Sequence, residues 1–262
     1  MADLYTIDTH NFATRDQRRQ QERYHHHHHP KEPHLQFLDN PPIRPPCLST
    51  LSPPEDFPID EDHEFKPTEF YFLKGAVHFK KTAEILDMTK KVKASRWRDF
   101  SQSFLRDVDN ASKKAEEDEE KPKYEITSCG EMMRTIKTMV DGEKGEKICE
   151  LSMTFVSFDS SQVRFPDKEH SRHPLEICPV EAGSENKHEC FVRHSIPYFW
   201  DMSSQFGDLY KCLNQKRVKI GSVCAFGFGK DAVLALEGDQ LDDVCAISTC
   251  VILLNGRDAM DH

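Results

Sequence analysis

The sequence predicts an α/β protein with three parts: a disordered N-terminal arm, a small basic segment of three helices, and a mixed sheet with flanking helices. Two changes of pattern support this division. Prolines are concentrated in the arm, where 10 of the 15 lie between Pro30 and Pro67. Apolar residues then recur at helical spacing, and after residue 147 the alternating spacing of strands becomes frequent.

Residues 1–67 form the predicted disordered arm. They contain four arginines near the start, five consecutive histidines at His25–His29 and the proline-rich stretch, but few apolar residues that could be buried. The histidine run could hold a divalent metal ion. Homopolymeric tracts of this kind are usually low-complexity sequence, and we favour that interpretation.

Residues 68–125 form the predicted basic helical segment. The apolar residues after Thr68 have spacings that suit three helices. Between Phe70 and Lys114 there are 11 Lys or Arg and 5 Asp or Glu, a local charge of +6 by subtraction, within a chain whose net charge is −10. An acidic run at residues 116–120 closes the segment.

Residues 126–262 form the predicted α/β domain. Ser128 and Glu131 have the spacing of a capping box, ahead of a helical apolar face that ends at Val140. Alternation predicts strands at 149–158, 175–181, 189–193 and 217–226, and helical spacing predicts helices at 206–213, 231–236 and 241–254. Three early strands followed by a helical crossover to a fourth indicate a mixed sheet.

The basic segment contains our candidate binding residues. Trp97 is flanked by five cations, and an aromatic anchor among phosphate-binding charges is typical of nucleic-acid recognition; the cations are Lys90, Lys91, Lys93, Arg96 and Arg98. An amphipathic bundle whose solvated face is basic explains the same residues equally well. Both interpretations stay open at this point.

No catalytic site can be read from the sequence. It has no Gly-x-Ser-x-Gly elbow, and Asp159 is a lone acid where a two-metal nuclease needs several carboxylates. Six potential metal ligands fall within 25 residues, but their spacing is looser than that of a structural zinc site. We interpret them as surface histidines and buried thiols: His170, His173, Cys178, His188, Cys190 and His194.

Cysteine usage and hydropathy indicate a compartment. The nine cysteines are an odd number without a dense framework, which predicts free, mostly buried thiols and no structural disulfide. No apolar run is long enough to span a bilayer, and the N-terminus lacks the regions of a secretory signal. We therefore expect a protein of the cytoplasm, the nucleus or both, without a membrane partner.

Two segments resemble known domains. Residues Phe70–Tyr124 resemble a divergent HMG box through the aromatic cluster Phe70-Tyr71-Phe72, through Lys90-Lys91-Val92 ahead of Trp97, and through Phe100-Ser101. The following region resembles the Maelstrom domain, an RNase H-like fold, and in the Maelstrom family such a domain follows an HMG box. The motifs that carry this second resemblance are Phe155-Val156-Ser157-Phe158, Pro174-Leu175-Glu176-Ile177, His188-Glu189-Cys190-Phe191-Val192 and the segment Asp243–Cys250.

The resemblance implies a non-catalytic nucleic-acid-binding or scaffolding factor in germline small-RNA-mediated gene silencing. Such a factor would contact RNA or DNA through the basic segment and act beside Argonaute-pathway proteins. Of the metal set of the family, Glu-Cys-His-Cys, only Glu176 and Cys245 can be carried over, so zinc is the one cofactor that the resemblance suggests. Two alternatives stay open: a protein-interaction adaptor without nucleic-acid contact, and a metal-dependent nuclease that would need Asp159 or Glu176.

Overall fold

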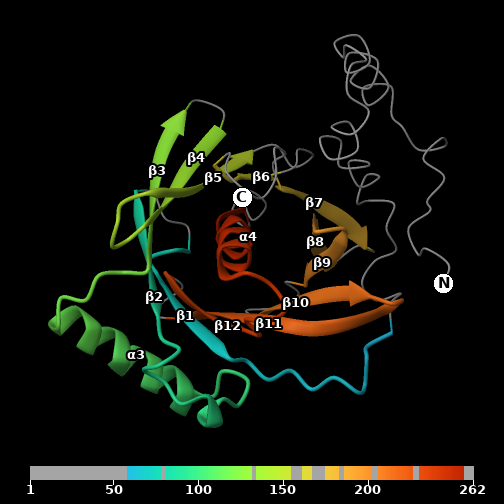
Figure 1. Ribbon diagram of the computed structural model, residues 1–262, viewed down its shortest axis with the longest axis horizontal. Coiled ribbons are helices and arrows are strands. Elements are labelled where there is room, and N and C mark those ends of the chain that lie inside the picture. The colour runs from blue at the N-terminus through green and yellow to red at the C-terminus, as the bar shows by residue number, and fades with distance from the viewer. Residues whose placement is uncertain are drawn as a thin grey trace.

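The computed structural model describes residues 58–77, 81–131, 134–154, 161–166, 175–182, 186–201, 206–226 and 230–256. Over these residues twelve antiparallel strands form a closed barrel, one α-helix runs through its centre and another lies against its outside (Figure 1). The elements are β1 (Glu69–Lys74), β2 (Thr82–Asp87), the 3₁₀ turn η3 (Ala94–Arg96), α3 (Gln102–Glu117), β3 (Tyr124–Glu131), β4 (Arg134–Asp141), β5 (Lys147–Thr154), β6 (Ser161–Arg164), β7 (Leu175–Ala182), β8 (Asn186–Arg193), β9 (Ile196–Asp201), β10 (Phe206–Leu213), β11 (Lys216–Phe226), β12 (Asp231–Leu236) and α4 (Asp243–Gly256).

The barrel closes because the first strand pairs with both the second and the last. β1 lies between β2 and β12, so that Tyr71 is opposite Asp87 on one side and Leu234 on the other. The remaining strands pair with their neighbours in sequence, which leaves no open edge in the described sheet. The predicted fold class is therefore wrong: the chain forms an antiparallel barrel, not a three-helix segment followed by an RNase H-like mixed sheet with flanking helices.

The inner core of the barrel is filled by α4. This helix has no polar face, and its residues from Cys245 to Leu254 are all buried. A helix that is apolar on every side is stable only where it is surrounded, as it is here by the inward-facing side chains of the strands. Its buried hydroxyls are satisfied, because Thr249 Oγ1 accepts from Trp200 Nε1 at 3.0 Å and Ser248 Oγ donates to the Cys245 carbonyl.

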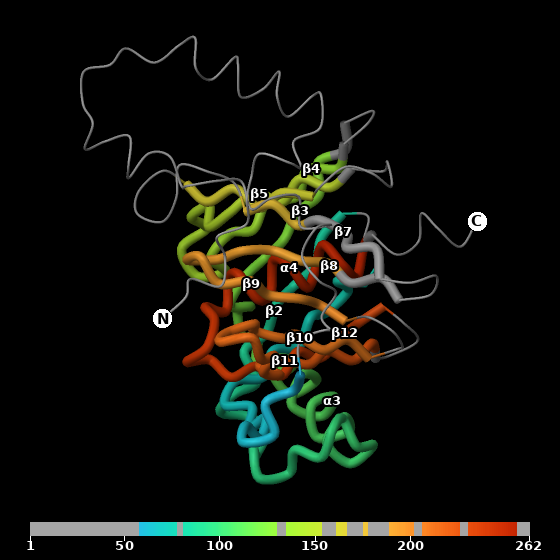
Figure 2. The backbone as a smooth tube through the Cα atoms, turned by 90° about the vertical axis from the view of Figure 1, so that its right-hand side faces the viewer, coloured from blue at the N-terminus to red at the C-terminus, as the bar shows by residue number. Residues whose placement is uncertain are grey.

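A second core joins α3 to the outer face of the barrel (Figure 2). Successive residues of β1 point to opposite sides, so that Tyr71 and Leu73 belong to the inner core while Phe70 and Phe72 pack beneath α3. Helix α3 begins at Ser101, whose side chain caps the helix by accepting a hydrogen bond from the Phe104 backbone N–H. We call residues 88–120, which cover this face, the β2–α3 lobe.

Several predicted helices are strands in the structure. Of the three helices predicted in the basic segment, the first two correspond to β1 and β2, and only the third is present, as α3. The helix predicted after the Ser128–Glu131 capping box falls on β3 and β4. The helices predicted at 206–213 and 231–236 are β10 and β12. These strands carry apolar residues on both faces, so their spacing imitates a helix.

The other element predictions are confirmed. β5 covers the strand predicted from residue 149 as far as residue 154, and the rest of that prediction lies outside the described residues. β7, β8 and β11 fall on the strands predicted at 175–181, 189–193 and 217–226. α4 falls on the helix predicted at 241–254.

The predicted arm is described only over its last ten residues, 58–67, and residues 1–57 lie outside the described part of the chain. Residues 58–67 lie alongside β11 and the end of β12. Ile59 bridges to Arg217, Lys216 Nζ lies 2.9 Å from Asp60 Oδ1, and the Lys66 backbone N–H donates to Glu237 Oε1 at 2.7 Å. The final residues of the arm thus lie against the barrel.

The described cysteines and helices bear on two further predictions. Seven cysteines have described side chains; all seven are free thiols, and all except Cys129 are buried, which agrees with the prediction of mostly buried thiols. Of the helices that the structure describes, none combines the length and the apolar character needed to cross a membrane.

Candidate functional site

The basic candidate residues lie in the loop that connects β2 to α3. The loop begins with a tight turn, in which the backbone N–H groups of Lys91 and Val92 both donate to the Met88 carbonyl. Val92 is buried in the second core, and this burial directs the lysines on either side of it outward. Lys90, Lys91, Lys93, Arg96 and Arg98 are all exposed. The local sequence therefore places a row of cations on the surface of the lobe.

A groove of about 480 Å³ separates this loop from α3. We call it the β2–α3 groove. Its basic lining residues are Lys91, Lys93, Arg96 and Lys114. Its acidic lining residues are Asp107, Asp118 and Glu120. The structure thus brings three of the predicted cations together with a fourth from α3, whereas Lys90 and Arg98 lie on the same loop without lining the groove.

Two of the four groove cations are paired with carboxylates. Arg96 Nη1 donates to Asp107 Oδ2 at 2.7 Å, and Lys91 Nζ pairs with Glu120. The ammonium groups of Lys93 and Lys114 have no ion pair or hydrogen bond within the described part of the chain. The groove therefore offers two cations without a contact partner among the described residues beside two that are engaged, and with its third carboxylate, Asp118, the four cations and three carboxylates of the lining have a net charge of +1.

Trp97 holds the lobe together. Its ring contacts four phenylalanine rings, with centroid distances of 4.6 to 6.0 Å, and three of these contacts are edge-to-face. Such aromatic contacts stabilise a core beyond the area that they bury. The ring is a packing residue in this structure, and the groove has no aromatic lining on which a nucleic-acid base could stack.

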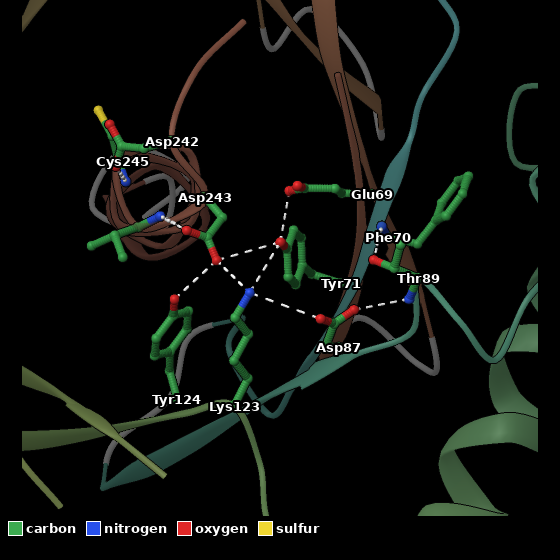
Figure 3. Close-up of polar contacts among 11 residues, drawn as sticks. Glu69, Phe70, Tyr71, Asp87, Thr89, Lys123, Tyr124, Asp242, Asp243 and Cys245 are labelled. Carbon is green, nitrogen blue, oxygen red and sulfur yellow. Dashed lines mark hydrogen bonds and ion pairs between the residues drawn. The ribbon is translucent and has the colours of Figure 1, made fainter. Parts of the chain in front are cut away.

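A separate polar cluster surrounds the start of α4 (Figure 3). Asp243 accepts a hydrogen bond from Tyr124 OH at 2.9 Å and lies 2.7 Å from Lys123 Nζ. Tyr71 OH donates to Glu69 Oε2 at 2.7 Å. Burial, and next the charge of Asp243, raise the pKa of both tyrosines, so these hydroxyls stay protonated and act as donors. The cluster ties α4 to β1 and β3, which is a structural role.

The two metal ligands carried over from the family resemblance do not meet. Cys245 lies on α4 within the inner core, where burial raises the pKa of its thiol and disfavours the thiolate that zinc binds. Leu175 and Ile177 of β7 face that core, and Glu176 between them points to the opposite side. Within the described ranges no three His, Cys, Asp or Glu side chains converge on a point where a metal ion could bind.

Other sequence candidates cannot be placed. Asp159, the His25–His29 run, His170 and His173 lie outside the described residues. The nuclease alternative, which needs Asp159 or Glu176, therefore stays a prediction.

Sequence inspection missed the α3 side of the groove. Asp107, Asn110, Lys114 and Asp118 recur three and four residues apart, which places them on one face of a helix. This spacing was available in the sequence, but it becomes meaningful only when the position of the basic loop is known.

Lys137 was also missed. It is 2% exposed inside the barrel, where its Nζ donates to Asn255 Oδ1 at 2.8 Å. Burial lowers the pKa of this lysine to about 7. No local sequence pattern marks it, because it stands among threonines and apolar residues of β4.

Comparisons with protein-family models, with curated proteins and with solved structures found no match for this chain. The resemblance to an HMG box and a Maelstrom domain therefore stays a prediction, and its opening aromatic motif, Phe70-Tyr71-Phe72, lies in a strand. The functional argument rests on the groove.

Proposed function

We propose that the protein is a non-catalytic binding module that holds the phosphate groups of RNA or DNA in the β2–α3 groove. The observation that carries the proposal is the convergence of four cations on one groove, two of them without a carboxylate partner among the described residues. Lysine and arginine side chains that neutralise phosphates supply most of the sequence-independent affinity of nucleic-acid-binding proteins. The local positive charge coexists with a net charge of −10 for the whole chain.

The lining of the groove supports recognition of the backbone rather than of the bases. Lysine ammonium groups act as point charges, and Trp97, the aromatic side chain nearest to them in sequence, is committed to the packing of the lobe. Contacts with phosphate position a strand without reading its sequence. With two to four phosphate contacts to a single strand, the logarithm of the binding constant should fall with the logarithm of salt concentration at a slope of about −1.5 to −3.

Two features favour binding over catalysis. The interior of the barrel, where such folds can hold a substrate, is occupied by α4. The titratable groups of the largest polar cluster, around Asp243, are engaged in fixing that helix.

The first test is fluorescence anisotropy of the full chain with single-stranded RNA and duplex DNA at two salt concentrations. We expect salt-sensitive binding that weakens by at least about tenfold when Lys90, Lys91 and Lys93 are all changed to Glu. A control with the same change of net charge replaces Lys81, Lys144 and Lys230, which are exposed and lie outside the groove. Equal losses in the two triple variants would contradict a specific role for the groove.

The protein-interaction adaptor is the second candidate function. It is favoured by the three carboxylates in the groove, because a mixed-charge surface complements a protein partner as well as it complements a phosphate backbone. The same titration separates the two candidates, since an adaptor would bind neither RNA nor DNA at low salt.

The role in germline small-RNA silencing, with Argonaute-pathway partners, is a further proposal supported by the sequence resemblance alone. Co-purification of the chain with an Argonaute protein from germline extract, and loss of that association in the Lys-to-Glu triple variant, would support it. Persistence of the association in the triple variant would assign it to another surface.

A further inference from the structure

The end of α3 is shaped so that its acidic run returns to the basic loop. The backbone N–H groups of Glu119 and Glu120 donate to the carbonyls of Glu116 and Ala115, a pattern that closes many helices. Glu119 has a φ of +52°, in the left-handed region that glycine usually fills at this position. This turn reverses the chain direction and brings Glu120 to Lys91.

Asp107 reaches the groove from the first half of the same helix. Its carboxylate is one-third exposed and accepts a hydrogen bond from Arg96 Nη1 at 2.7 Å. Asp107 and Glu120 thus each hold one groove cation, from opposite ends of α3. A carboxylate and a phosphate oxygen make the same kind of charge-assisted hydrogen bond to lysine and arginine.

We propose that Glu120 and Asp107 act as built-in competitors of the ligand, so that the groove accepts strands carrying several phosphates and excludes single-phosphate ligands. This inference rests on the proposed function. A lone phosphate can contact Lys93 and Lys114, but to contact a third cation it must displace a carboxylate. A strand already held at those two lysines presents its next phosphates at high effective concentration and can displace both carboxylates.

The two ion pairs, Lys91–Glu120 and Arg96–Asp107, are weak enough for a phosphate strand to displace them. Lys91, Glu120 and Arg96 have side-chain exposures of 29%, 44% and 58%, so both ion pairs are in contact with solvent. Exposed ion pairs of this kind are each worth about 0.2 to 1 kcal/mol. Two such pairs, removed together, correspond to an affinity change on the order of 2- to 30-fold.

The test compares two double variants of the full chain, each of which removes two negative charges from or next to α3. Asp107→Asn with Glu120→Gln releases the groove cations, whereas Asp109→Asn with Glu117→Gln alters α3 residues that do not line the groove. The probes are a labelled 12-nucleotide single strand, adenosine monophosphate and inorganic phosphate. Melting curves of all the proteins establish that each variant is folded.

We expect the wild type to bind the strand and neither small ligand. The Asp107/Glu120 variant should bind the strand 2- to 30-fold more tightly, with a steeper salt dependence, and should gain measurable affinity for adenosine monophosphate. The Asp109/Glu117 variant should bind like the wild type. Equal gains in the two double variants, or no gain in either, would overturn the inference.

The outcomes also separate this inference from the proposed function. Suppose that the wild type binds the strand, that the Lys90/Lys91/Lys93 variant does not, and that the Asp107/Glu120 variant binds it like the wild type. In that case the proposed function holds and only the competition by carboxylates is wrong. If the wild type fails to bind the strand and the Asp107/Glu120 variant binds it, the carboxylates exclude strands as well as single phosphates, and both the selectivity and the proposed function fail. If neither binds at low salt, both proposals fail.

Discussion

Lys137 is a buried residue whose ionisation should be coupled to folding near neutral pH. It is 2% exposed within the barrel, and burial lowers its pKa to about 7 from the value of 10.5 for a lysine in water. Because the unfolded chain keeps this proton up to about pH 10.5, the unfolded state binds more protons than the folded state between pH 7 and that value. Stability contributed by this group therefore rises with pH across that window and is constant below it.

This pH dependence can be measured by comparing the wild type with Lys137→Met. The free energy of unfolding of the wild type relative to the variant should rise between pH 7 and 8.5 by up to about 1.4 kcal/mol per pH unit. Urea denaturation at several pH values measures it. Lys144→Met, which changes an exposed lysine, should show no such trend, and a flat difference for Lys137→Met would contradict a lowered pKa.

Individual residues of the groove were predictable only in part. Local charge density identified Lys91, Lys93 and Arg96, because they lie close together in sequence on one loop. Their partners Asp107 and Glu120 lie 11 and 29 residues away from the cations that they pair with, so no local pattern connects them. Trp97 was predicted to be an aromatic anchor for nucleic acid, and in the structure its ring takes part in the packing of the lobe.

At the scale of elements, β1 and β12 explain why the fold class was mispredicted. Each has one face in the inner core and the other beneath the lobe, so both read as continuous apolar runs. A strand buried on both sides cannot be told from a buried helix by periodicity. Strands with polar residues at alternate positions, such as β5, keep their alternation and were identified.

β10 was mispredicted because its apolar residues lie on both of its faces. Leu209 faces the inner core, whereas Tyr210 and Cys212 occupy alternate positions on the other face. The apolar residues at 206, 209, 210 and 213 therefore have the three- and four-residue spacings of a helix, although β10 pairs regularly with β9 and the extra residue of the register shift is Ile220 of β11. α4 was identified because its predominantly apolar sequence, fourteen residues long, exceeds the usual length of a strand.

A fully buried hydrogen bond between Trp200 of β9 and Thr249 contributes to the fit between α4 and the barrel. Thr249→Val keeps the shape of the side chain but removes the acceptor of Trp200 Nε1, which would be left buried without its partner. We expect a loss of about 1 to 3 kcal/mol in the free energy of unfolding. Ser248→Ala, which removes a hydroxyl that bonds only within the helix, is the control and should cost less. Equal losses would show that the inter-element bond contributes nothing.

At the scale of the whole molecule, the two cores share the same strands. β1 and β12 supply residues both to the inner core around α4 and to the second core beneath α3. β1 also closes the barrel by pairing with β12, although Glu69 and its partner Leu236 are 167 residues apart in sequence (236 − 69). The sequence predicted two separate units, residues 68–125 and 126–262. In the structure, strands of these two segments are hydrogen-bonded to one another at β1–β12 and at β2–β3.

This arrangement predicts that the lobe and the barrel unfold together. The two tryptophans of the chain report on the two cores separately, since Trp97 lies in the lobe and Trp200 is fully buried in the barrel. In Trp97→Phe the remaining fluorescence follows the barrel, and in Trp200→Phe it follows the lobe. Each variant should show a fluorescence transition in urea with the same midpoint as its own far-ultraviolet circular dichroism transition, because a shared strand cannot leave one core and remain in the other. A lobe transition at clearly lower urea than the loss of strand signal would mean that α3 detaches from an intact barrel, and that the groove opens and closes independently of the fold.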